Sequence, residues 1–162
     1  MKRGVALIGF MGAGKSTVGP LLAEALDLGF VDLDKRISIQ ENSSIPDFFE
    51  RFGEAAFRVA ERKALEEVLG RGPCVLACGG GTPCQEGLLE RLGHWGHVAF
   101  LDASFAAIKS RSVQGRPLWN GEVQELYQSR RATYEKAEIH LDADQEPQHI
   151  VSVALACLGF RS

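Results

Sequence analysis

The chain has 162 residues, a length that predicts one domain with its own hydrophobic core. Hydrophobic residues make up 45% and charged residues 24%, which is typical of a globular protein and excludes a disordered or fibrous chain. The formal net charge of −3 argues against nucleic acids and anionic membranes as partners, since both attract basic surfaces. Any bound anion is therefore expected to meet positive charge that is local to its site.

The apolar runs and the cysteines indicate where the protein resides. No run approaches the roughly 18 consecutive apolar residues that a membrane-spanning helix needs. The opening MKRGVALIGF is interrupted by glycine and leads into a glycine and lysine cluster, so it predicts a first strand rather than an export signal. The four cysteines lack CxxC or zinc-site spacing, and we expect reduced thiols in a soluble, cytoplasmic protein without a structural metal.

Apolar patterning predicts strands and helices that alternate along the chain, as in an α/β protein whose helices cover both faces of a parallel sheet. Strands are predicted at 5–8, 28–34, 74–78, 97–102 and 138–142. Helices are predicted at 16–28, at 44–70 with a break near Gly53, at 85–93, 105–112 and about 123–137, and after Pro147. The stretch 113–123 has glycines, a proline and no periodicity, which predicts a mobile surface loop.

A phosphate-binding motif follows the first predicted strand. Its sequence, GFMGAGKS, matches the pattern G-x-x-x-x-G-K-[ST] and opens a predicted helix. In such a loop the backbone N–H groups and the helix N-terminus surround a phosphate, the lysine reaches the terminal phosphates and the serine holds Mg²⁺. The alternative, a plain glycine-rich turn, is disfavoured by the complete motif in this context. The residues predicted to bind the nucleotide here are Gly12, Ala13, Gly14, Lys15, Ser16 and Thr17.

Two aspartates, Asp32 and Asp34, end the second predicted strand. Ligands of open parallel sheets collect at the carboxyl ends of the strands, where the phosphate loop also lies. At i, i+2 spacing in a strand both side chains would share a face, about 7 Å apart. One carboxylate can then hold Mg²⁺ while the other accepts a hydrogen bond from an attacking hydroxyl. Taken alone, the pair would be interpreted as a solvated strand end.

Three classes of phosphate-loop protein are open at this point: a small-molecule kinase, a guanine-nucleotide switch and a nucleotide-binding protein without turnover. A switch protein should contain an N-K-x-D segment that reads the base, and the sequence has none. Choosing between kinase and inert binder requires residues for a second substrate.

Six segments, in this order and spacing, closely resemble those of shikimate kinases: GFMGAGKSTVG, FVDLDKRI, SIPDFFERFGEAAFRVAE, CGGGT, GRPLW and RRATY. The resemblance covers essentially the whole chain and implies a three-layer α/β/α kinase fold with a five-stranded parallel sheet. It also implies a substrate-binding region at about 33–61 and a mobile lid at about 112–124. The implied reaction is transfer of the γ-phosphoryl group of ATP, with Mg²⁺, to the 3-hydroxyl of shikimate, on the way to chorismate and aromatic amino acids, by a monomeric enzyme.

The resemblance also implies the residues that hold shikimate. Asp34 matches the aspartate that binds the shikimate hydroxyls, and Asp32 the one associated with Mg²⁺. Arg58 matches an arginine that holds the shikimate carboxylate, a task that suits the planar fork of a guanidinium. Without the resemblance, an i, i+4 ion pair with Glu54 would be the preferred interpretation of Arg58. Glu61, one turn further along, can orient that guanidinium or be a plain surface residue.

Further matches concern the turn after the third strand and the lid. Gly79, Gly80 and Gly81 resemble the triple-glycine turn that lets backbone N–H groups approach the substrate. Arg130 matches a second clamp on the carboxylate, with Arg131 as the alternative. Arg116 resembles the lid arginine that closes over the transferring phosphate, and Arg111 the arginine beside adenine.

The residues expected to act in catalysis are thus Lys15, Asp34 and Arg116, and whether Asp34 accepts a proton or only orients the hydroxyl is open. Trp119 and Cys78 depart from the family pattern, where leucine and threonine are common. Two other functions remain as alternatives: a related kinase for quinate or gluconate, and nucleotide binding without turnover.

Overall fold

The computed structural model describes residues 3–111 and 121–160, which contain a five-stranded sheet in the order β2-β3-β1-β4-β5. Every neighbouring pair of these strands is parallel, which confirms the predicted fold class. The strands are β1 (Gly4–Ile8), β2 (Phe30–Asp32), β3 (Val75–Ala77), β4 (Gly96–Asp102) and β5 (Ile139–Asp142).

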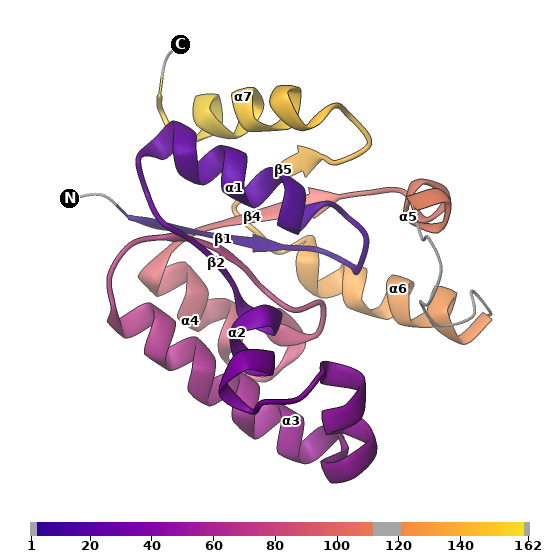
Figure 1. Ribbon diagram of the computed structural model, residues 1–162. Helices are drawn as coiled ribbons and strands as arrows, with labels where there is room; N and C mark the ends of the chain where they lie inside the picture. Colours follow the sequence, from indigo (N-terminus) through magenta and orange to yellow (C-terminus); the bar gives the residue numbers. More distant parts are fainter. Residues whose placement is uncertain (1–2, 112–120, 161–162) are drawn as a thin grey trace.

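Helices pack on both sides of the sheet, so that the fold has three layers (Figure 1). Helices α1 and α7 lie together on one face, and α3, α4 and α6 lie on the other. The helices are α1 (Lys15–Leu26), α2 (Leu33–Gln40), α3 (Ile45–Gly70), α4 (Leu88–Trp95), α5 (Phe105–Arg111), α6 (Gly121–Tyr134) and α7 (Pro147–Cys157), with the 3₁₀ turn η1 at Thr82–Cys84.

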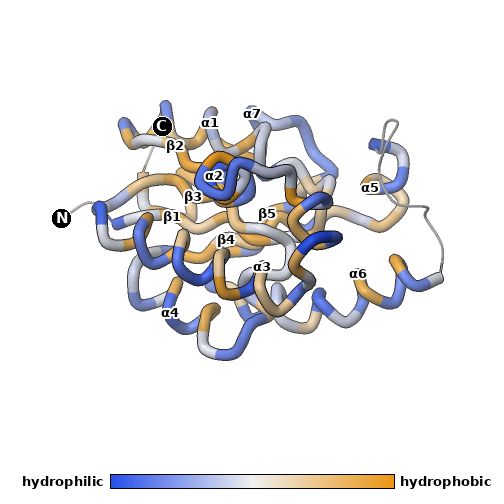
Figure 2. Tube along the Cα trace, turned by 60° about the horizontal axis from the view of Figure 1, so that its bottom comes forward, coloured by the Kyte–Doolittle hydropathy of each residue, from blue (hydrophilic) through white to orange (hydrophobic). Residues whose placement is uncertain are grey.

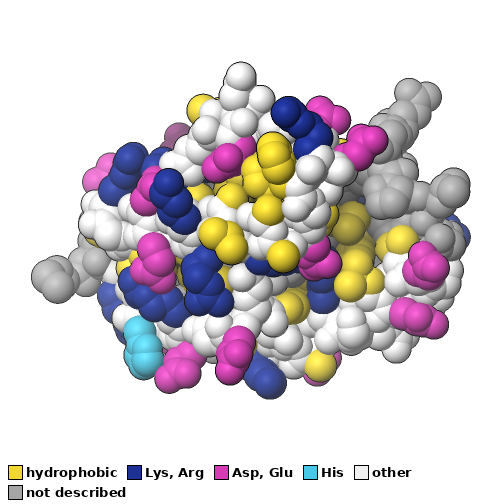
Figure 3. Space-filling model, turned by 90° about the horizontal axis from the view of Figure 1, so that it is seen from below, with side chains coloured by type: hydrophobic (Ala, Val, Ile, Leu, Met, Phe, Trp, Pro, Cys, Tyr) yellow, Lys and Arg dark blue, Asp and Glu magenta, His cyan; other side chains and the backbone are white. Residues whose placement is uncertain are grey.

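The central strands form the core. All five residues of β1 are buried, as expected for a parallel strand that is covered on both faces. The strands accordingly appear hydrophobic in Figure 2, between helices whose outer faces are hydrophilic. On the face shown in Figure 3, the described acidic and basic side chains are interspersed rather than gathered by sign. Among the described residues, no helix is both long and apolar enough to cross a membrane.

Helix α3 shows how local sequence signals determine a long element. Ser44 caps its start, because its Oγ accepts a hydrogen bond from the backbone N–H of Asp47 at 3.2 Å. Gly53 has φ 81° and ψ 173° and interrupts the helix, which confirms the predicted break. Beyond it, Phe57 and Leu65 belong to a buried stripe that packs on the sheet.

The predicted end of the second strand is wrong. β2 ends at Asp32, and Asp34 lies in the first turn of α2, a helix that the apolar pattern did not reveal. The carboxylate of Asp32 accepts a hydrogen bond from the N–H of Lys35 at 3.2 Å and so caps α2. The two aspartates are therefore not a strand pair at i, i+2 spacing. Capping by Asp32 favours a helix where the alternating pattern suggested continued strand.

The predicted loop at 113–123 and the lid at about 112–124 are covered only in part. Residues 112–120, which include Arg116 and Trp119, lie outside the described residues. Residues 121 and 122, predicted as loop, instead belong to α6, which begins two residues before the predicted start at about 123.

Candidate active site

The phosphate loop joins β1 to α1 and forms the floor of the candidate site. Gly12 and Gly14 have φ values of 80° and 103°, a region that disfavours side chains with a Cβ. Lys15 folds back over the loop, and its Nζ donates to the carbonyl of Gly9 at 2.5 Å and of Phe10 at 3.0 Å. Burial lowers the pKa of Lys15 to about 8, against a partly compensating attraction to acidic groups nearby. The ammonium is thus held by carbonyls in a site shaped for an anion.

A cavity of about 440 Å³ opens above this loop and brings most of the predicted nucleotide residues together. The predicted residues that line it are Gly12, Gly14, Lys15, Ser16, Thr17, Asp32, Asp34, Gly80 and Arg111. Ala13 is buried beneath the loop and faces a neighbouring cavity instead. Cys78 also lines the first cavity, and burial raises the pKa of its thiol, which therefore stays protonated.

Ser16 and Asp32 meet at the edge of this cavity. The Oγ of Ser16 donates to Oδ2 of Asp32 at 3.0 Å, which places a hydroxyl and a carboxylate side by side. Magnesium prefers such hard oxygen ligands and commonly takes only one or two from the protein, completing its shell with water and phosphate oxygens. The donor set therefore fits Mg²⁺. No cluster of three or more acidic, histidine or cysteine side chains suited to a metal occurs in the described part of the chain.

Asp34 also lines the cavity, from the first turn of α2. Burial raises the pKa of its carboxyl, and the nearby carboxylates of Glu61 and Asp32 raise it further. Lys15 and Arg58 act in the opposite direction without cancelling the shift. A carboxyl with a raised pKa is a better proton acceptor when ionised than an ordinary aspartate.

The triple-glycine turn after β3 has polar groups against each of its residues. A Cβ added at Gly79 would lie 2.9 Å from Oδ1 of Asp34, and one at Gly80 would lie 3.1 Å from Nη1 of Arg130. A Cβ at Gly81 would overlap the guanidinium of Arg58. The turn therefore gathers Asp34, Arg58 and Arg130, which are predicted to hold one substrate although they come from three helices.

Arg58 is oriented by a buried carboxylate. Its Nη1 donates to Oε1 of Glu61 at 2.7 Å, and its Nη2 donates to the exposed Glu54 at 3.4 Å. Glu61 is only 1% exposed and also accepts from Oγ1 of Thr82 at 2.7 Å and from Nε2 of Gln85. Arg58 thus makes the i, i+4 contact with Glu54 and also the contact with Glu61 that orients its guanidinium, and the contact with Glu61 is the shorter one. Thr82 and Gln85 were not identified from the sequence, where only the adjacent glycines marked their segment.

The geometry separates the two neighbouring arginines of α6. The guanidinium of Arg130 lies 5.9 Å from the ring centre of Phe10, beside the phosphate loop, and close to Gly80. Arg131 instead forms a two-point ion pair with Asp102, at 2.5 Å and 2.8 Å. Arg130, and not Arg131, lies at the triple-glycine turn. Tyr134, one turn further, donates from its hydroxyl to the carbonyl of Gly80 at 2.6 Å and holds the turn against α6.

Arg111 lies at the other end of the phosphate loop. Its guanidinium donates to the carbonyl of Ala143 at 2.7 Å, and it lines both the first cavity and a second one of about 250 Å³. The second cavity is lined by residues of the phosphate loop and α1 on one side and by residues 143–147 on the other. The predicted lid arginine, Arg116, lies outside the described residues.

Comparison with known proteins identifies the family of this chain. The family model described as Shikimate kinase matches residues 11–158. A shikimate kinase from Sulfurihydrogenibium sp. is 37% identical over 159 residues, covering 94% of this chain and 96% of the relative.

Two solved structures are similar along nearly the whole chain. The crystal structure of shikimate kinase from Aquifex aeolicus has 36% identity and a TM-score of 0.86, covering 96% of this chain and 95% of its own. Shikimate kinase from Acinetobacter baumannii in complex with shikimate has 33% identity and a TM-score of 0.86, covering 95% and 93%. The chain therefore belongs to the shikimate kinase family, a family of ATP-using kinases.

Proposed function

We propose that this protein transfers the γ-phosphoryl group of ATP to the 3-hydroxyl of shikimate, forming shikimate 3-phosphate and ADP. The observation that carries the proposal is one cavity in which the phosphate loop faces Asp34, with Arg58 and Arg130 around the adjoining triple-glycine turn. Membership of the shikimate kinase family supports shikimate as the acceptor over quinate or gluconate, and turnover over inert binding.

The two arginines are proposed to hold the carboxylate of shikimate. Arg58 and Arg130 approach the triple-glycine turn from α3 and α6, so that a carboxylate between them would meet two guanidinium groups. Charge-assisted hydrogen bonds of this kind are about twice as strong as neutral ones. The buried Glu61 keeps Arg58 in place before the substrate arrives, which reduces the ordering cost of binding.

The phosphate loop is proposed to hold the nucleotide. Its N–H groups and the start of α1 attract the phosphates, and Lys15 can exchange its two carbonyl partners for phosphate oxygens. Arg111 and the cavity toward 143–147 are proposed to take the adenosine end. Arg116, the lid arginine by resemblance, is proposed to neutralise charge on the transferring phosphate.

Ser16 and Asp32 would hold Mg²⁺, which when bound supplies positive charge to the phosphate oxygens. Asp34 is proposed to accept a hydrogen bond from the attacking hydroxyl, and its raised pKa makes it the described group best suited to receive the proton. Catalysis then consists mainly of positioning the hydroxyl in line with the phosphate and neutralising charge. We further propose that the enzyme acts as a monomer in the cytoplasm.

The test is a coupled assay of ADP formation with shikimate, quinate and gluconate. Shikimate alone should support turnover; ADP formation with gluconate but not with shikimate, or ATP binding without turnover for all three, contradicts the proposal. Arg58→Ala and Arg130→Ala should each raise the KM for shikimate by roughly tenfold or more and change the KM for ATP little. Arg62→Ala is the matched control, because this exposed arginine lies one turn from Arg58 and donates to the carbonyl of Glu86 instead.

A further inference from the structure

Helix α6 packs on the core through Tyr134 and through two side chains that are only partly buried, Val123 and Tyr127. Within its described residues, Tyr134 is the only buried side chain, at the C-terminal end of the helix. Figure 1 shows the N-terminal part of α6 extending away from the sheet. Most helices in proteins are held in place by a buried apolar face. With so small a buried face, polar contacts gain weight in directing α6, and with it Arg130.

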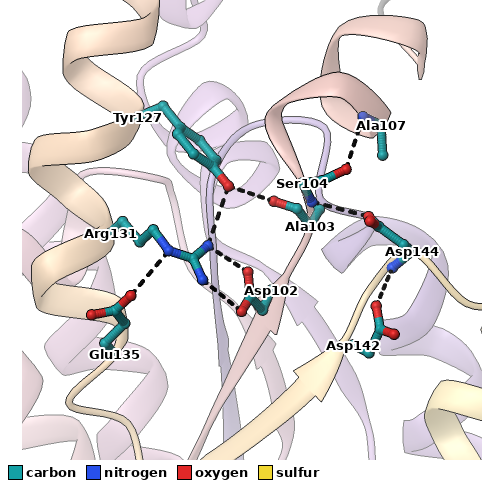
Figure 4. A network of polar contacts seen from close by, with 9 residues as sticks. All are labelled: Asp102, Ala103, Ser104, Ala107, Tyr127, Arg131, Glu135, Asp142 and Asp144. Carbon is teal, nitrogen blue, oxygen red and sulfur yellow. Dashed lines mark hydrogen bonds and ion pairs between the residues drawn. The ribbon is translucent and has the colours of Figure 1, made fainter.

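Arg131 supplies such a contact. Its guanidinium binds both oxygens of Asp102, the last residue of β4, at 2.5 Å and 2.8 Å (Figure 4). The hydroxyl of Tyr127, one turn earlier in α6, lies 3.2 Å from Nη1 of Arg131 and donates to the carbonyl of Ala103 at 2.8 Å. Two successive turns of α6 are thus joined to the end of β4 by polar contacts.

The same guanidinium is further fixed by its surroundings. It lies 5.6 Å from the ring centre of Phe100 on β4, and its Nε contacts Glu135 at 3.0 Å along α6. A two-point pair between a planar guanidinium and a carboxylate restricts orientation as well as distance. The Asp102–Arg131 pair is therefore a contact that restrains the rotation of α6 relative to β4.

Arg131 and Asp102 are outside the candidate active site. They line a separate open cavity of about 470 Å³, with Tyr127 and His140, and neither lines the cavity above the phosphate loop. Arg131 is also not among the neighbours that a Cβ at Gly79, Gly80 or Gly81 would meet, whereas Arg58 and Arg130 are.

We propose that Arg131 is a positioning residue that acts through Asp102: their ion pair sets the rotation of α6 and so directs the adjacent Arg130 at the triple-glycine turn. Consecutive residues of a helix project about 100° apart, so anchoring one side chain to β4 fixes the direction of the next. This inference rests on the proposed function, in which Arg130 binds the shikimate carboxylate. Arg131 would then affect shikimate binding by orienting Arg130, without touching shikimate itself.

The first test uses Arg131→Met, which keeps an apolar stem but removes the ion pair, and Asp102→Asn. Each should raise the KM for shikimate roughly tenfold, since misplaced binding groups lose much of their effect, while the KM for ATP changes less than about twofold. Because both residues are about one-third exposed, thermal unfolding should change little. The double variant should be no worse than either single one, as for partners in one interaction. Additive effects, or equal losses for shikimate and ATP, would overturn the proposal.

The second test separates indirect from direct action. In an Arg130→Ala background, adding Arg131→Met should produce no further rise in the KM for shikimate, because the residue being positioned is absent. Arg131→Lys keeps the charge but loses the two-point geometry, and should lie between wild type and Arg131→Met. A full additional rise on top of Arg130→Ala would mean that Arg131 meets the substrate itself and would refute the inference.

Glu135→Gln is the matched control. Glu135 contacts the same guanidinium, but as an i, i+4 pair within α6, so its loss breaks no bond between helix and sheet. Its KM for shikimate should equal that of the wild type. A rise as large as for Asp102→Asn would show that the charge of Arg131, rather than the helix orientation, is what matters, and would overturn the proposal.

A measurement that does not depend on enzyme activity can test the anchoring of α6 separately from the proposed function. Amide hydrogen exchange of α6 should be faster in Arg131→Met than in wild type and unchanged in Glu135→Gln. If the wild type fails to phosphorylate shikimate while α6 exchange still rises, the proposed function fails and the anchoring of α6 stands. Unchanged exchange in Arg131→Met would refute the anchoring itself.

Discussion

Glu61 accepts a hydrogen bond from Nη1 of Arg58 at 2.7 Å, and of the two side chains the carboxylate is the buried one, 1% exposed against 23%. A buried carboxylate is costly unless its oxygens are paired, and here Thr82 and Gln85 provide the remaining partners. Arg58 is thus oriented by a buried carboxylate before any ligand binds.

Glu61→Ala is therefore expected to affect both stability and binding. Three donors lose their acceptor, one of them the buried hydroxyl of Thr82, and the free energy of unfolding should fall by about 3 kcal/mol. Urea denaturation measures this change. The KM for shikimate should also rise, while the KM for ATP should not.

Glu54→Ala is the control, because Glu54 contacts the same guanidinium from an exposed position at 3.4 Å. Its effect on the free energy of unfolding should stay within about 0.5 kcal/mol. Equal effects of the two variants would contradict the importance given to the buried pair.

A second prediction concerns Gly81 in the triple-glycine turn. Gly81 has ordinary backbone angles, φ −89° and ψ −9°, so alanine is conformationally acceptable there. Its Cβ would, however, displace the guanidinium of Arg58. Gly81→Ala should raise the KM for shikimate by roughly tenfold or more with little change for ATP, as measured in the coupled assay.

Gly93→Ala gives the comparison for that variant. Gly93 lies in α4 with no neighbour that a Cβ would meet, so alanine should stabilise the helix by roughly 0.5–1 kcal/mol and leave both KM values unchanged. If Gly81→Ala also leaves them unchanged, Arg58 does not hold shikimate in the position proposed.

The pKa of Lys15 predicts how nucleotide binding depends on pH. Burial lowers this pKa to about 8 in the free protein, so the ammonium that attracts phosphate is lost as the pH rises through that value. The dissociation constant of ATP, measured by calorimetry, should be nearly flat below pH 8 and then rise by up to about tenfold per pH unit.

The same group affects stability with a defined sign. Between pH 8 and the ordinary value of 10.5, the unfolded chain holds the Lys15 proton more tightly than the folded one, so this contribution to stability rises with pH. Lys15→Met should bind ATP weakly at every pH, without the change near pH 8. A wild-type affinity that stays constant from neutral pH to well above 8 contradicts the assignment.

Asp34→Asn should lower turnover while raising the free energy of unfolding. Without a proton acceptor, turnover should fall about 10² to 10⁴-fold in the coupled assay. Because the pKa of Asp34 is raised, its charge destabilises the fold at neutral pH, and the asparagine variant should have the higher free energy of unfolding there.

This stability difference should diminish as the pH falls toward the ordinary aspartate value of 3.8, below which the carboxyl is protonated in both states. Denaturation at neutral and acidic pH tests it. Turnover close to that of the wild type would rule out Asp34 as an essential base.

The predicted elements that proved correct depend on local signals. The apolar run of β1, the glycine-rich loop and the break at Gly53 each result from residues that are close in the chain, so patterning was sufficient. The helix α2 was missed because Asp32 is compatible with both a strand end and a helix cap. Its capping bond to Lys35 becomes visible only in three dimensions.

The α/β fold, the phosphate loop and, through resemblance, the family could be predicted from the sequence alone. The resemblance pointed to Arg130 with Arg131 as the alternative, and the tertiary structure places Arg130 against the triple-glycine turn. The partners that make this choice, Asp102 for Arg131 and Gly80 for Arg130, lie 29 and 50 residues away along the chain. Local periodicity carries no information about such pairs, because they meet only when the parallel sheet brings the ends of β3 and β4 to the same edge.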